Sequence, residues 1–371
     1  MIRRVLITGG AGFIGSHLAD ELLARGHTVR ALDALVPQVH GATARRPSYL
    51  APEVDLIVGD VRDPATVARA LDGVDVVYHF AARVGVGQSM YEVAEYTSVN
   101  NLGTAVLLEA LIARPVKRLI VASSMSIYGE GLYRDDGEQV VTGAQRTQQQ
   151  LLRGEWEPLG ANGRPLVPVP TPEWKRPTLA SVYALSKYDQ ERMCLMTGAA
   201  YNIPTVALRF FNVYGTRQAL SNPYTGVLAI FAARFLNNKS PLVFEDGRQR
   251  RDFVHVKDVA EACRLALEVE AAAGEVFNIG SGRDISIREV AERMAHVLGR
   301  DLAPEITGQY RVGDIRHCSA DIGRARRLLG YRPSIEFDSG LAELASWLST
   351  QTATDRVDTM RSELASRGLA L

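Results

Sequence analysis

The feature that most constrains the fold of this chain is a regular alternation of short aliphatic runs with amphipathic segments through its first half. Each run predicts a buried strand, and each segment between two runs predicts a helix with one apolar face. This alternation, with short loops, is typical of an α/β fold in which helices cover both faces of a parallel sheet. The expected strands span residues 5–7, 28–32, 56–58, 74–79 and 118–122, and the expected helices span residues 16–25, 64–71 and 99–113.

Beyond about residue 210 the alternation becomes irregular, which predicts a second, smaller α/β domain that holds the substrate. The length of 371 residues also exceeds that of an ordinary single domain, roughly 100–200 residues. We therefore expect a sheet domain over residues 1–208 and a substrate domain mainly over residues 209–371. A stretch rich in Gln, Gly and Pro, residues 130–180, predicts an insertion in the first domain. A polar helical pattern at residues 356–365 predicts a helix, but the sequence does not indicate the function of this helix.

Composition argues against several classes of function. Lys and Arg number 42, and so do Asp and Glu, so the chain has no net charge with which to bind nucleic acid or an anionic membrane. The three cysteines, Cys194, Cys263 and Cys318, lie far apart and form neither a zinc motif nor a disulfide framework. No apolar run approaches the ~18 residues of a membrane span. These observations predict a soluble, cytoplasmic protein without a metal site.

A glycine-rich turn follows the first expected strand. Gly9, Gly12 and Gly15 differ from the dinucleotide-binding fingerprint G-x-G-x-x-G by one inserted residue. Glycine at these positions permits a tight turn and lets the backbone and a helix N-terminus approach a diphosphate. Asp33 ends the second expected strand, where a carboxylate bonds the adenosine ribose 2′-hydroxyl and repels a 2′-phosphate. Together these residues predict an NAD site rather than an NADP site, with an ordinary turn acid as the alternative role of Asp33.

Tyr183 and Lys187 lie four residues apart, which places them on one face of a helix. A free tyrosine, with a pKa of about 10, is a poor base at neutral pH. A neighbouring ammonium group and a positively charged nicotinamide ring both favour the phenolate. Ser123 and Ser124 follow the fifth expected strand, where a hydroxyl group can position a sugar hydroxyl for proton transfer. We therefore predict that Ser124, Tyr183 and Lys187 are the catalytic residues.

With these motifs in this order, the chain resembles the extended short-chain dehydrogenase/reductase family, and within it the branch of nucleotide-sugar epimerases and dehydratases. The resemblance implies a Rossmann domain that binds NAD and a C-terminal domain that binds a nucleotide sugar. It also implies that the chain crosses back to the first domain around residues 241–258. The matching segments are residues 8–15, 59–61, 79–82, 123–129, 183–187, 209–215 and 251–256.

The resemblance further implies roles for individual residues. Asn212, Arg251 and Arg311 match positions that hold the diphosphate of the substrate, and two cations in a neutral chain suit a dianion. The residues expected to contact NAD are Gly9, Gly12, Phe13, Ile14, Gly15, Asp33, Asp60, Val61, Phe80, Ala81, Ala82, Asn100, Ser123, Tyr183 and Lys187. The residues expected to contact the substrate are Val84, Gly85, Gln88, Ser89, Ser124, Ser126, Asn212, Arg251 and Arg311.

The residues after Ser124 bear on the type of reaction. In the dehydratases that the chain resembles, an acidic residue stands two positions before the Tyr-Gly pair, and the related decarboxylases keep a glutamate there. Here Met125 and Ser126 occupy the segment, and neither is an effective general acid or base. The resemblance therefore favours epimerisation at carbon 4 over dehydration or decarboxylation, unless an acid from the insertion takes that place.

Within the branch, the segments 82–90, 126–131 and 219–226 and the insertion resemble the subgroup of dTDP-L-rhamnose 4-epimerases. This subgroup interconverts dTDP-L-rhamnose and dTDP-6-deoxy-L-talose. Three alternatives stay open: a UDP-glucose or UDP-glucuronate 4-epimerase, a nucleotide-4-keto-sugar reductase, and a non-catalytic NAD-sensing regulator. The family also implies a homodimer, formed through helices at residues 99–113 and 182–200.

Overall fold

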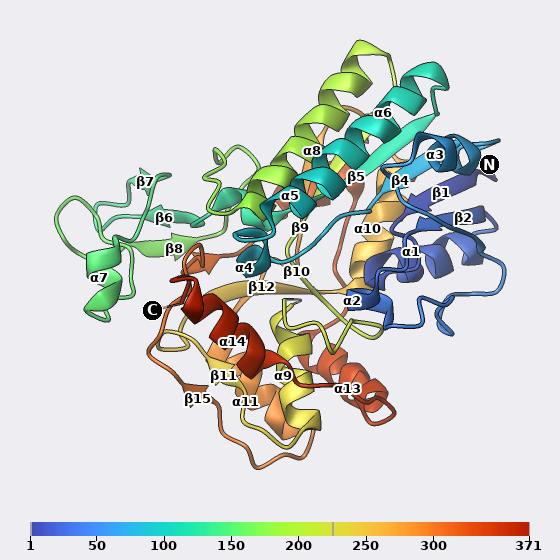
Figure 1. Ribbon diagram of the computed structural model, residues 1–371. Helices are drawn as coiled ribbons and strands as arrows, with labels where there is room; N and C mark the ends of the chain where they lie inside the picture. Colours follow the sequence, from blue (N-terminus) through green and yellow to red (C-terminus); the bar gives the residue numbers. More distant parts are fainter. Residues whose placement is uncertain (1, 225, 371) are drawn as a thin grey trace.

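A seven-stranded sheet forms the centre of the computed structural model, which describes residues 2–224 and 226–370 (Figure 1). Its strands are β1 (Arg4–Thr8), β2 (Thr28–Asp33), β3 (Asp55–Val58), β4 (Val76–His79), β5 (Arg118–Ser124), β9 (Thr205–Phe210) and β13 (Val276–Ile279). They lie in the order β13–β9–β5–β4–β1–β2–β3, and every neighbouring pair is parallel. The predicted Rossmann-type α/β fold is therefore confirmed, with the carboxyl ends of all seven strands at one edge.

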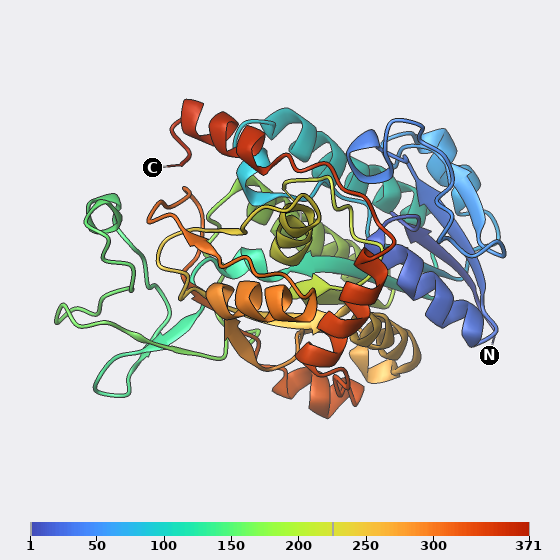
Figure 2. The same cartoon turned by 90° about the horizontal axis from the view of Figure 1, so that it is seen from below.

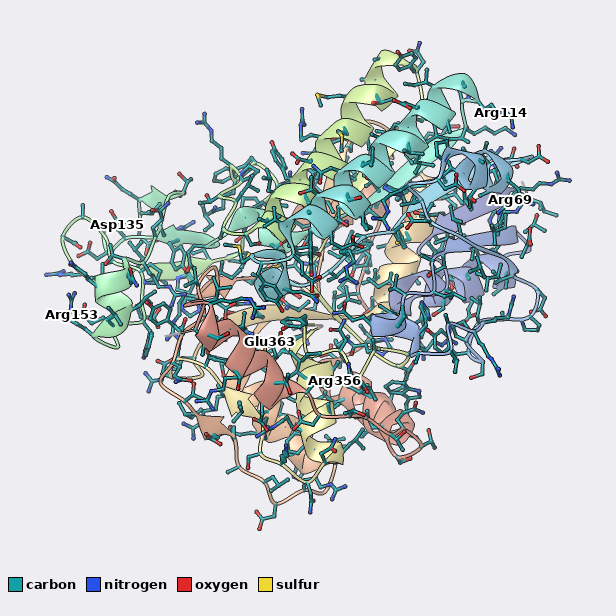
Figure 3. All side chains as sticks on the ribbon, viewed as in Figure 1. Arg69, Arg114, Asp135, Arg153, Arg356 and Glu363 are labelled. Atoms are coloured by element: carbon teal, nitrogen blue, oxygen red, sulfur yellow. The ribbon has the colours of Figure 1, made fainter. Side chains whose placement is uncertain are left out.

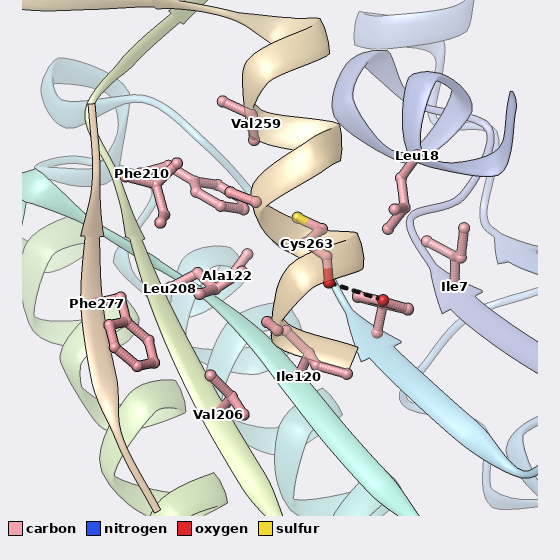
Figure 4. Packing of buried hydrophobic residues seen from close by; sticks show 14 of the residues in the cluster. Ile7, Leu18, Ile120, Ala122, Val206, Leu208, Phe210, Val259, Cys263 and Phe277 are labelled. Carbon is pink, nitrogen blue, oxygen red and sulfur yellow. Dashed lines mark hydrogen bonds between the residues drawn. The ribbon is translucent and has the colours of Figure 1, made fainter. Parts of the chain in front are cut away.

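Helices cover both faces of this sheet, as the alternation predicts. One face is covered by α1 (Phe13–Ala24), α10 (Val256–Glu268) and α12 (Gly323–Leu329), and the other by α3 (Pro64–Ala70), α6 (Gly103–Ala113) and α8 (Val182–Ala200). In the first layer, Leu18 of α1 and Cys263 of α10 are fully buried above Ile7 and Ile120 of the sheet (Figure 4). The Tyr78 hydroxyl donates a hydrogen bond of 2.9 Å to the carbonyl of Cys263, which satisfies a buried polar group.

The C-terminal part of the chain forms a smaller lobe beside the central sheet (Figure 2). Its apolar cluster includes Phe231, Phe253, Val290 and Leu344. Thr225, in the segment 219–226, lies outside the described residues. In the described ranges, no helix combines the length and the apolar character needed to cross a membrane. The main elements of the lobe are β10 (Asn212–Tyr214), α9 (Val227–Leu236), β12 (Arg250–His255), β14 (Asp284–Ser286), α11 (Ile287–Val297), β16 (His317–Cys318) and α13 (Phe337–Leu348).

The chain crosses back from this lobe to the central sheet with α10 and β13. The predicted range for this return, residues 241–258, includes the start of α10 at Val256, while β12, in the same range, still pairs with β10, β14 and β16 in a second sheet. The return begins with α10 because Val259, Cys263 and Ala266 form an apolar stripe that the central sheet buries. The central sheet and its helices therefore include α10 and β13 as well as elements from the first 210 residues.

The insertion over residues 130–180 projects from the body of the molecule as a small antiparallel sheet (Figure 1). The side chain of Arg316, which is fully buried, donates hydrogen bonds to Glu157 of the insertion and to Glu245 of the C-terminal lobe. Because a buried charge without its partner is costly, this pairing fixes the insertion against that lobe. The elements of the insertion are β6 (Leu132–Arg134), β7 (Val140–Val141), α7 (Gln148–Leu152) and β8 (Val167–Val169).

Candidate active site

The glycine-rich turn connects β1 to α1 and lies against the end of β4. Gly9 has a φ of 71°, and a Cβ atom there would lie 3.0 Å from the backbone nitrogen of Ala81. A Cβ atom on Gly15 would lie 2.4 Å from the carbonyl oxygen of Gly9, so both positions require glycine. Gly12 precedes α1 without a side-chain cap, and the first turn of α1 contains no acidic residue. The positive end of this helix therefore suits a diphosphate.

Asp33, at the end of β2, is a buried acid beside this turn. Its Oδ2 accepts a hydrogen bond of 3.0 Å from the amide of Ala11, and its Oδ1 accepts one of 2.9 Å from the amide of Leu35. The Nε2 atom of His40 lies 3.5 Å from Oδ1, so Oδ2 is the oxygen whose second lone pair is open to a ribose hydroxyl. The carboxylate thus fits the predicted contact with the adenosine ribose, and it also braces the turn.

Asp60 and Val61, predicted to contact the cofactor, follow β3. The Arg62 guanidinium lies 2.6 Å from the Asp60 carboxylate, and its hydrogen bonds lower the pKa of that acid. Val61 is buried among the side chains of α3 and α6. Arg62 therefore neutralises the charge of Asp60 within the protein, and Val61 contributes an apolar side chain beside it.

Phe80, Ala81 and Ala82, also predicted to contact the cofactor, follow β4. The amides of Phe80 and Ala81 each donate a hydrogen bond of 3.1 Å to the Thr8 hydroxyl oxygen. These bonds hold the end of β4 beside the glycine turn, so the two predicted cofactor segments meet. The remaining predicted residues of this group, Phe13 and Ile14, form the half-buried first turn of α1.

The predicted base, Tyr183, lies half-buried in the first turn of α8. Its ring packs edge-on against Tyr96 of α5 (Val93–Tyr96), with the ring centroids 6.4 Å apart. Burial raises the pKa of the Tyr183 phenol, and a hydrogen bond with Ser124 opposes this rise. The Ser124 Oγ also accepts a hydrogen bond of 2.9 Å from the Ser126 hydroxyl. The fold thus joins the predicted base of α8 to the predicted serine at the end of β5.

Lys187, one turn further along α8, is only 3% exposed. Its Nζ donates a hydrogen bond of 2.7 Å to Oε1 of Gln190, and burial lowers the pKa of Lys187 to about 8. The Gln190 Nε2 in turn donates to the Thr104 hydroxyl at 2.9 Å. Sequence reasoning missed Gln190 as a positioning residue, although its spacing of three from Lys187 places both on one helix face.

The hydroxyl of Ser123, predicted to contact the cofactor, donates a hydrogen bond of 2.6 Å to the Glu191 carboxylate. Glu191 also accepts hydrogen bonds of 2.9 and 2.7 Å from the Arg209 guanidinium, which lies 5.0 Å from the ring centroid of Tyr128. Ser123 therefore takes part in a buried network that joins β5, α8 and β9. Neither Glu191 nor Arg209 is among the site residues predicted from the sequence. For Arg209 the available signal was a charged residue within an otherwise apolar strand.

Gln88 and Ser89, predicted to contact the sugar, are buried in α4 (Val86–Ser89). The Ser89 hydroxyl donates to the carbonyl of Val86 at 2.6 Å and accepts a hydrogen bond of 3.0 Å from the amide of Tyr183. The Gln88 amide group donates to Glu92 at 3.0 Å. Both side chains are thus directed to protein groups, and Ser89 positions the start of the catalytic helix.

Asn100, predicted to contact the cofactor, is fully buried in the π-helical turn Thr97–Leu102. Its side chain accepts a hydrogen bond of 2.7 Å from the amide of Arg83 and donates one of 2.9 Å to the Ser186 hydroxyl. Asn100 therefore ties the loop after β4 to α8. In that loop Val84 is 53% exposed and Gly85 has a φ of 143°, and both remain candidates for substrate contact.

Asn212 and Arg251, predicted to bind the diphosphate, come from β10 and β12. The Oδ1 atom of Asn212 is buried, and no group in the described ranges donates to it. A diphosphate has only acceptor oxygens, so it would bind the amide nitrogen of Asn212, whereas this buried oxygen calls for a donor such as a hydroxyl group. The Arg251 guanidinium donates hydrogen bonds of 2.9 Å to the carbonyls of Arg250 and Arg316 and another to the carbonyl of Ile315, so three of its five N–H groups are used within the lobe.

Arg311, the third predicted diphosphate residue, precedes β16. Its guanidinium lies 4.6 Å from the ring centroid of Phe244 and 2.8 Å from the Asp314 carboxylate. Arg311 also lines a cavity of 420 Å³ between the C-terminal lobe, the insertion and the segment that leads into α8. Other residues that line this cavity include Gly129, Arg146, Thr178, Ala180 and Gly313.

The sequence matches the model of the NAD dependent epimerase/dehydratase family over residues 5–149 and 166–280. It is 35% identical to the dTDP-L-rhamnose 4-epimerase of Burkholderia thailandensis, over 94% of this chain and 96% of that protein. The fold matches the Thermus thermophilus UDP-glucose 4-epimerase in complex with NAD, with a TM-score of 0.74, 32% identity and coverage of 94% and 100% of the two chains. It also matches a UDP-glucuronic acid 4-epimerase of Bacillus cereus, with a TM-score of 0.75, 28% identity and coverage of 93% and 99%.

Proposed function

The chain belongs to the NAD dependent epimerase/dehydratase family, so its cofactor is NAD, and from this premise we propose that it is a nucleotide-sugar 4-epimerase acting on a dTDP-6-deoxyhexose. The segment after Ser124 carries the proposal. Met125 is buried in the core, and the Ser126 hydroxyl donates to Ser124, so neither supplies the acid–base group that elimination of water needs. Oxidation of a sugar hydroxyl, followed by reduction, needs one base beside the cofactor.

In the proposed reaction Tyr183 takes the proton from the hydroxyl on carbon 4 of the sugar. Bound NAD supplies the acceptor for the hydride from that carbon, and a positively charged ring that lowers the pKa of the phenol. Lys187 adds a second positive charge on the same helix face, and Ser124 orients the sugar hydroxyl. Reduction of the 4-keto sugar from its opposite face would use the same bound cofactor, and Tyr183 returns the proton to the oxygen on carbon 4.

The choice of a dTDP-6-deoxyhexose rests on the likeness to the Burkholderia thailandensis enzyme. UDP-glucose and UDP-glucuronate form the second candidate, supported by the two structural matches. A cytoplasmic location belongs to the same proposal, because three buried cysteines without disulfide bonds suit a reducing compartment.

Incubation of the purified protein with dTDP-L-rhamnose, UDP-glucose or UDP-glucuronate, without added cofactor, tests the proposal. We expect NMR to detect dTDP-6-deoxy-L-talose from the first substrate. In D₂O the epimer should carry no deuterium on carbon, because the original hydride returns to carbon 4. Deuterium at carbon 5 of a 4-keto-6-deoxy product from UDP-glucose would instead indicate a 4,6-dehydratase, because that sugar has a hydroxyl on carbon 6 to eliminate. Turnover of the UDP-sugars alone, to their 4-epimers, would favour the second candidate.

Replacing Asp33 with alanine should weaken NAD binding by about 10- to 100-fold and relax discrimination against NADP, because hydrogen bonds to a charged group contribute about 1.5–3 kcal/mol. The measurement is the amount of each nucleotide released on denaturation, together with its Kd. Asp72→Ala, at an exposed acid on the same lobe, is the control. Equal NAD content in Asp33→Ala and the control would contradict the assignment of Asp33.

We also propose that the protein is a homodimer formed through α6 and α8. These helices lie side by side on one face of the sheet (Figure 1). Three large apolar side chains at or beside them are exposed to solvent: Leu102 by 53%, Leu185 by 46% and Met196 by 55%. Burial of such side chains favours association. Light scattering at micromolar concentration should give twice the chain mass, and Met196→Glu should shift it toward the monomer. A monomer mass for the unmodified chain would exclude the dimer.

A further inference from the structure

The C-terminal helix α14 (Val357–Ser366) lies between the two lobes, close to α4 (Figure 1). Its buried side chains Val357, Met360 and Leu364 form an apolar cluster with Leu242 of the C-terminal lobe. Partly buried side chains from both lobes complete this cluster, among them Tyr91, Tyr224 and Ile230. The helix that the sequence analysis left without a role is therefore packed against both halves of the molecule.

One carboxylate and two tyrosines hold this contact together. Glu363, labelled in Figure 3, accepts hydrogen bonds of 2.6 Å from the Tyr224 hydroxyl and 3.1 Å from the Tyr91 hydroxyl. The Arg367 guanidinium lies 4.3 Å from the centroid of the Tyr91 ring. Tyr91 follows α4 in the first lobe and Tyr224 precedes α9 in the second, so Glu363 joins both lobes to the C-terminal segment.

The residues after α14 pair with the loop that carries Arg311. The amide of Val312 donates a hydrogen bond of 2.9 Å to the carbonyl of Leu369, and Arg311 forms a β-bridge with Ala370. Arg361 of α14 donates a hydrogen bond of 2.7 Å to Oε1 of Gln309, at the start of the same loop. The C-terminal segment therefore determines where the backbone of Arg311 lies.

On its other side the segment packs directly on α4. A Cβ atom on Gly87 would lie 3.3 Å from Cδ2 of Leu364. Ser89, two residues after Gly87 in α4, accepts the hydrogen bond from the amide of Tyr183. A Cβ atom on Gly313 would in turn lie 3.0 Å from the carbonyl of Ala180, just before α8. The Arg311 loop, α4 and the start of the catalytic helix thus meet, and the C-terminal segment supports the first two.

We propose that the C-terminal segment, residues 357–370, positions the substrate site, with Glu363 as the positioning residue that joins the lobes through Tyr91 and Tyr224. This inference rests on the proposed function, because it names what completes the nucleotide-sugar site. None of the contacts described for the segment involves the glycine turn or Asp33. Loss of the segment's contacts therefore weakens the binding of nucleotide sugars and leaves NAD in place.

Replacing Glu363 with alanine tests the positioning role. We expect KM for the nucleotide sugar to rise at least about tenfold, the effect of losing hydrogen bonds to a charged group, while kcat stays within about threefold and NAD content is unchanged. Glu363→Gln keeps an acceptor for a tyrosine hydroxyl and should recover most of the loss. Arg356→Gln is the matched control, because Arg356 is an exposed residue that precedes the same helix (Figure 3). A purely structural role would lower thermal stability without this split between KM and kcat.

Hydrogen exchange makes the test independent of the identity of the substrate. In Glu363→Ala, the amides of α4 and of residues 309–313 should exchange at least about tenfold faster, while those of β1 and α1 keep their rates. Unchanged exchange in both segments, or an unchanged KM, would overturn the positioning role. If the unmodified chain converts no nucleotide sugar, the proposed function fails, and the exchange rates alone then support or overturn the role of Glu363.

Discussion

Tyr183→Phe is expected to lower epimerase turnover by about 10²–10⁴-fold, the usual contribution of a general base. The ring would keep its edge-on packing against Tyr96, and only the hydroxyl that bonds Ser124 would be lost. NAD content and nucleotide-sugar affinity should therefore stay close to those of the unmodified protein. Initial rates with dTDP-L-rhamnose, together with a nucleotide assay after denaturation, would measure both effects.

Tyr188→Phe provides the matched control for this variant. Tyr188 lies on the same helix and packs against the core, and within residues 2–224 and 226–370 its hydroxyl has no hydrogen-bond partner. The control should keep its turnover, since it loses a hydroxyl of the same kind away from the reacting sugar. Undiminished turnover in Tyr183→Phe would refute the proposed base, whereas equal losses in both variants would point to a general defect of α8.

Glu191→Ala is expected to lower the free energy of unfolding by about 3–5 kcal/mol, the cost of leaving one partner of a buried ion pair unpaired. Glu191 and Arg209 are 1% and 5% exposed, and the Arg209 guanidinium lies 2.7 Å from the carboxylate. The same change removes the acceptor of the Ser123 hydroxyl. Urea unfolding, followed by circular dichroism, would measure the loss.

Glu53→Ala, at an exposed position before β3, is the control for this measurement and should change the free energy of unfolding by less than about 0.5 kcal/mol. Combining Glu191→Leu with Arg209→Met should recover much of the loss, because apolar side chains of similar size need no charged partner. A loss below about 1 kcal/mol in Glu191→Ala, the range of an exposed ion pair, would show that solvent reaches this network.

Some predicted site residues have hydrogen-bond partners within the protein that the sequence did not indicate. The sequence places Ser89 in a loop that faces a sugar, and the fold instead turns its hydroxyl to the amide of Tyr183. Ser123 likewise bonds Glu191, and Asn100 bonds Ser186 and the backbone of Arg83. A polar side chain at the end of a strand satisfies its hydrogen bonds with whichever group the fold brings near, and this group is not encoded in the local pattern.

The sequence by itself determined the features whose cause is local. Gly9 needs a positive φ and Gly15 has no space for a Cβ atom, so both positions require glycine. This requirement appears in the sequence as a motif that can be recognised without knowledge of the fold. Asp33 ends a strand of clear aliphatic character, and the spacing of Tyr183 and Lys187 follows from the period of one helix. The strand–helix alternation predicted the parallel sheet because this alternation, too, is a local pattern of apolar residues.

Only the tertiary structure decided how these parts are held. Glu191 meets Arg209 because β9 runs beside β5 under α8, and Gln190 meets Thr104 because α8 packs on α6. Tyr91 and Glu363 are 272 residues apart in the chain, and their hydrogen bond exists because the C-terminal helix returns to the first lobe. Contacts between distant residues depend on which strands and helices become neighbours, and the packing of the whole apolar core determines that arrangement.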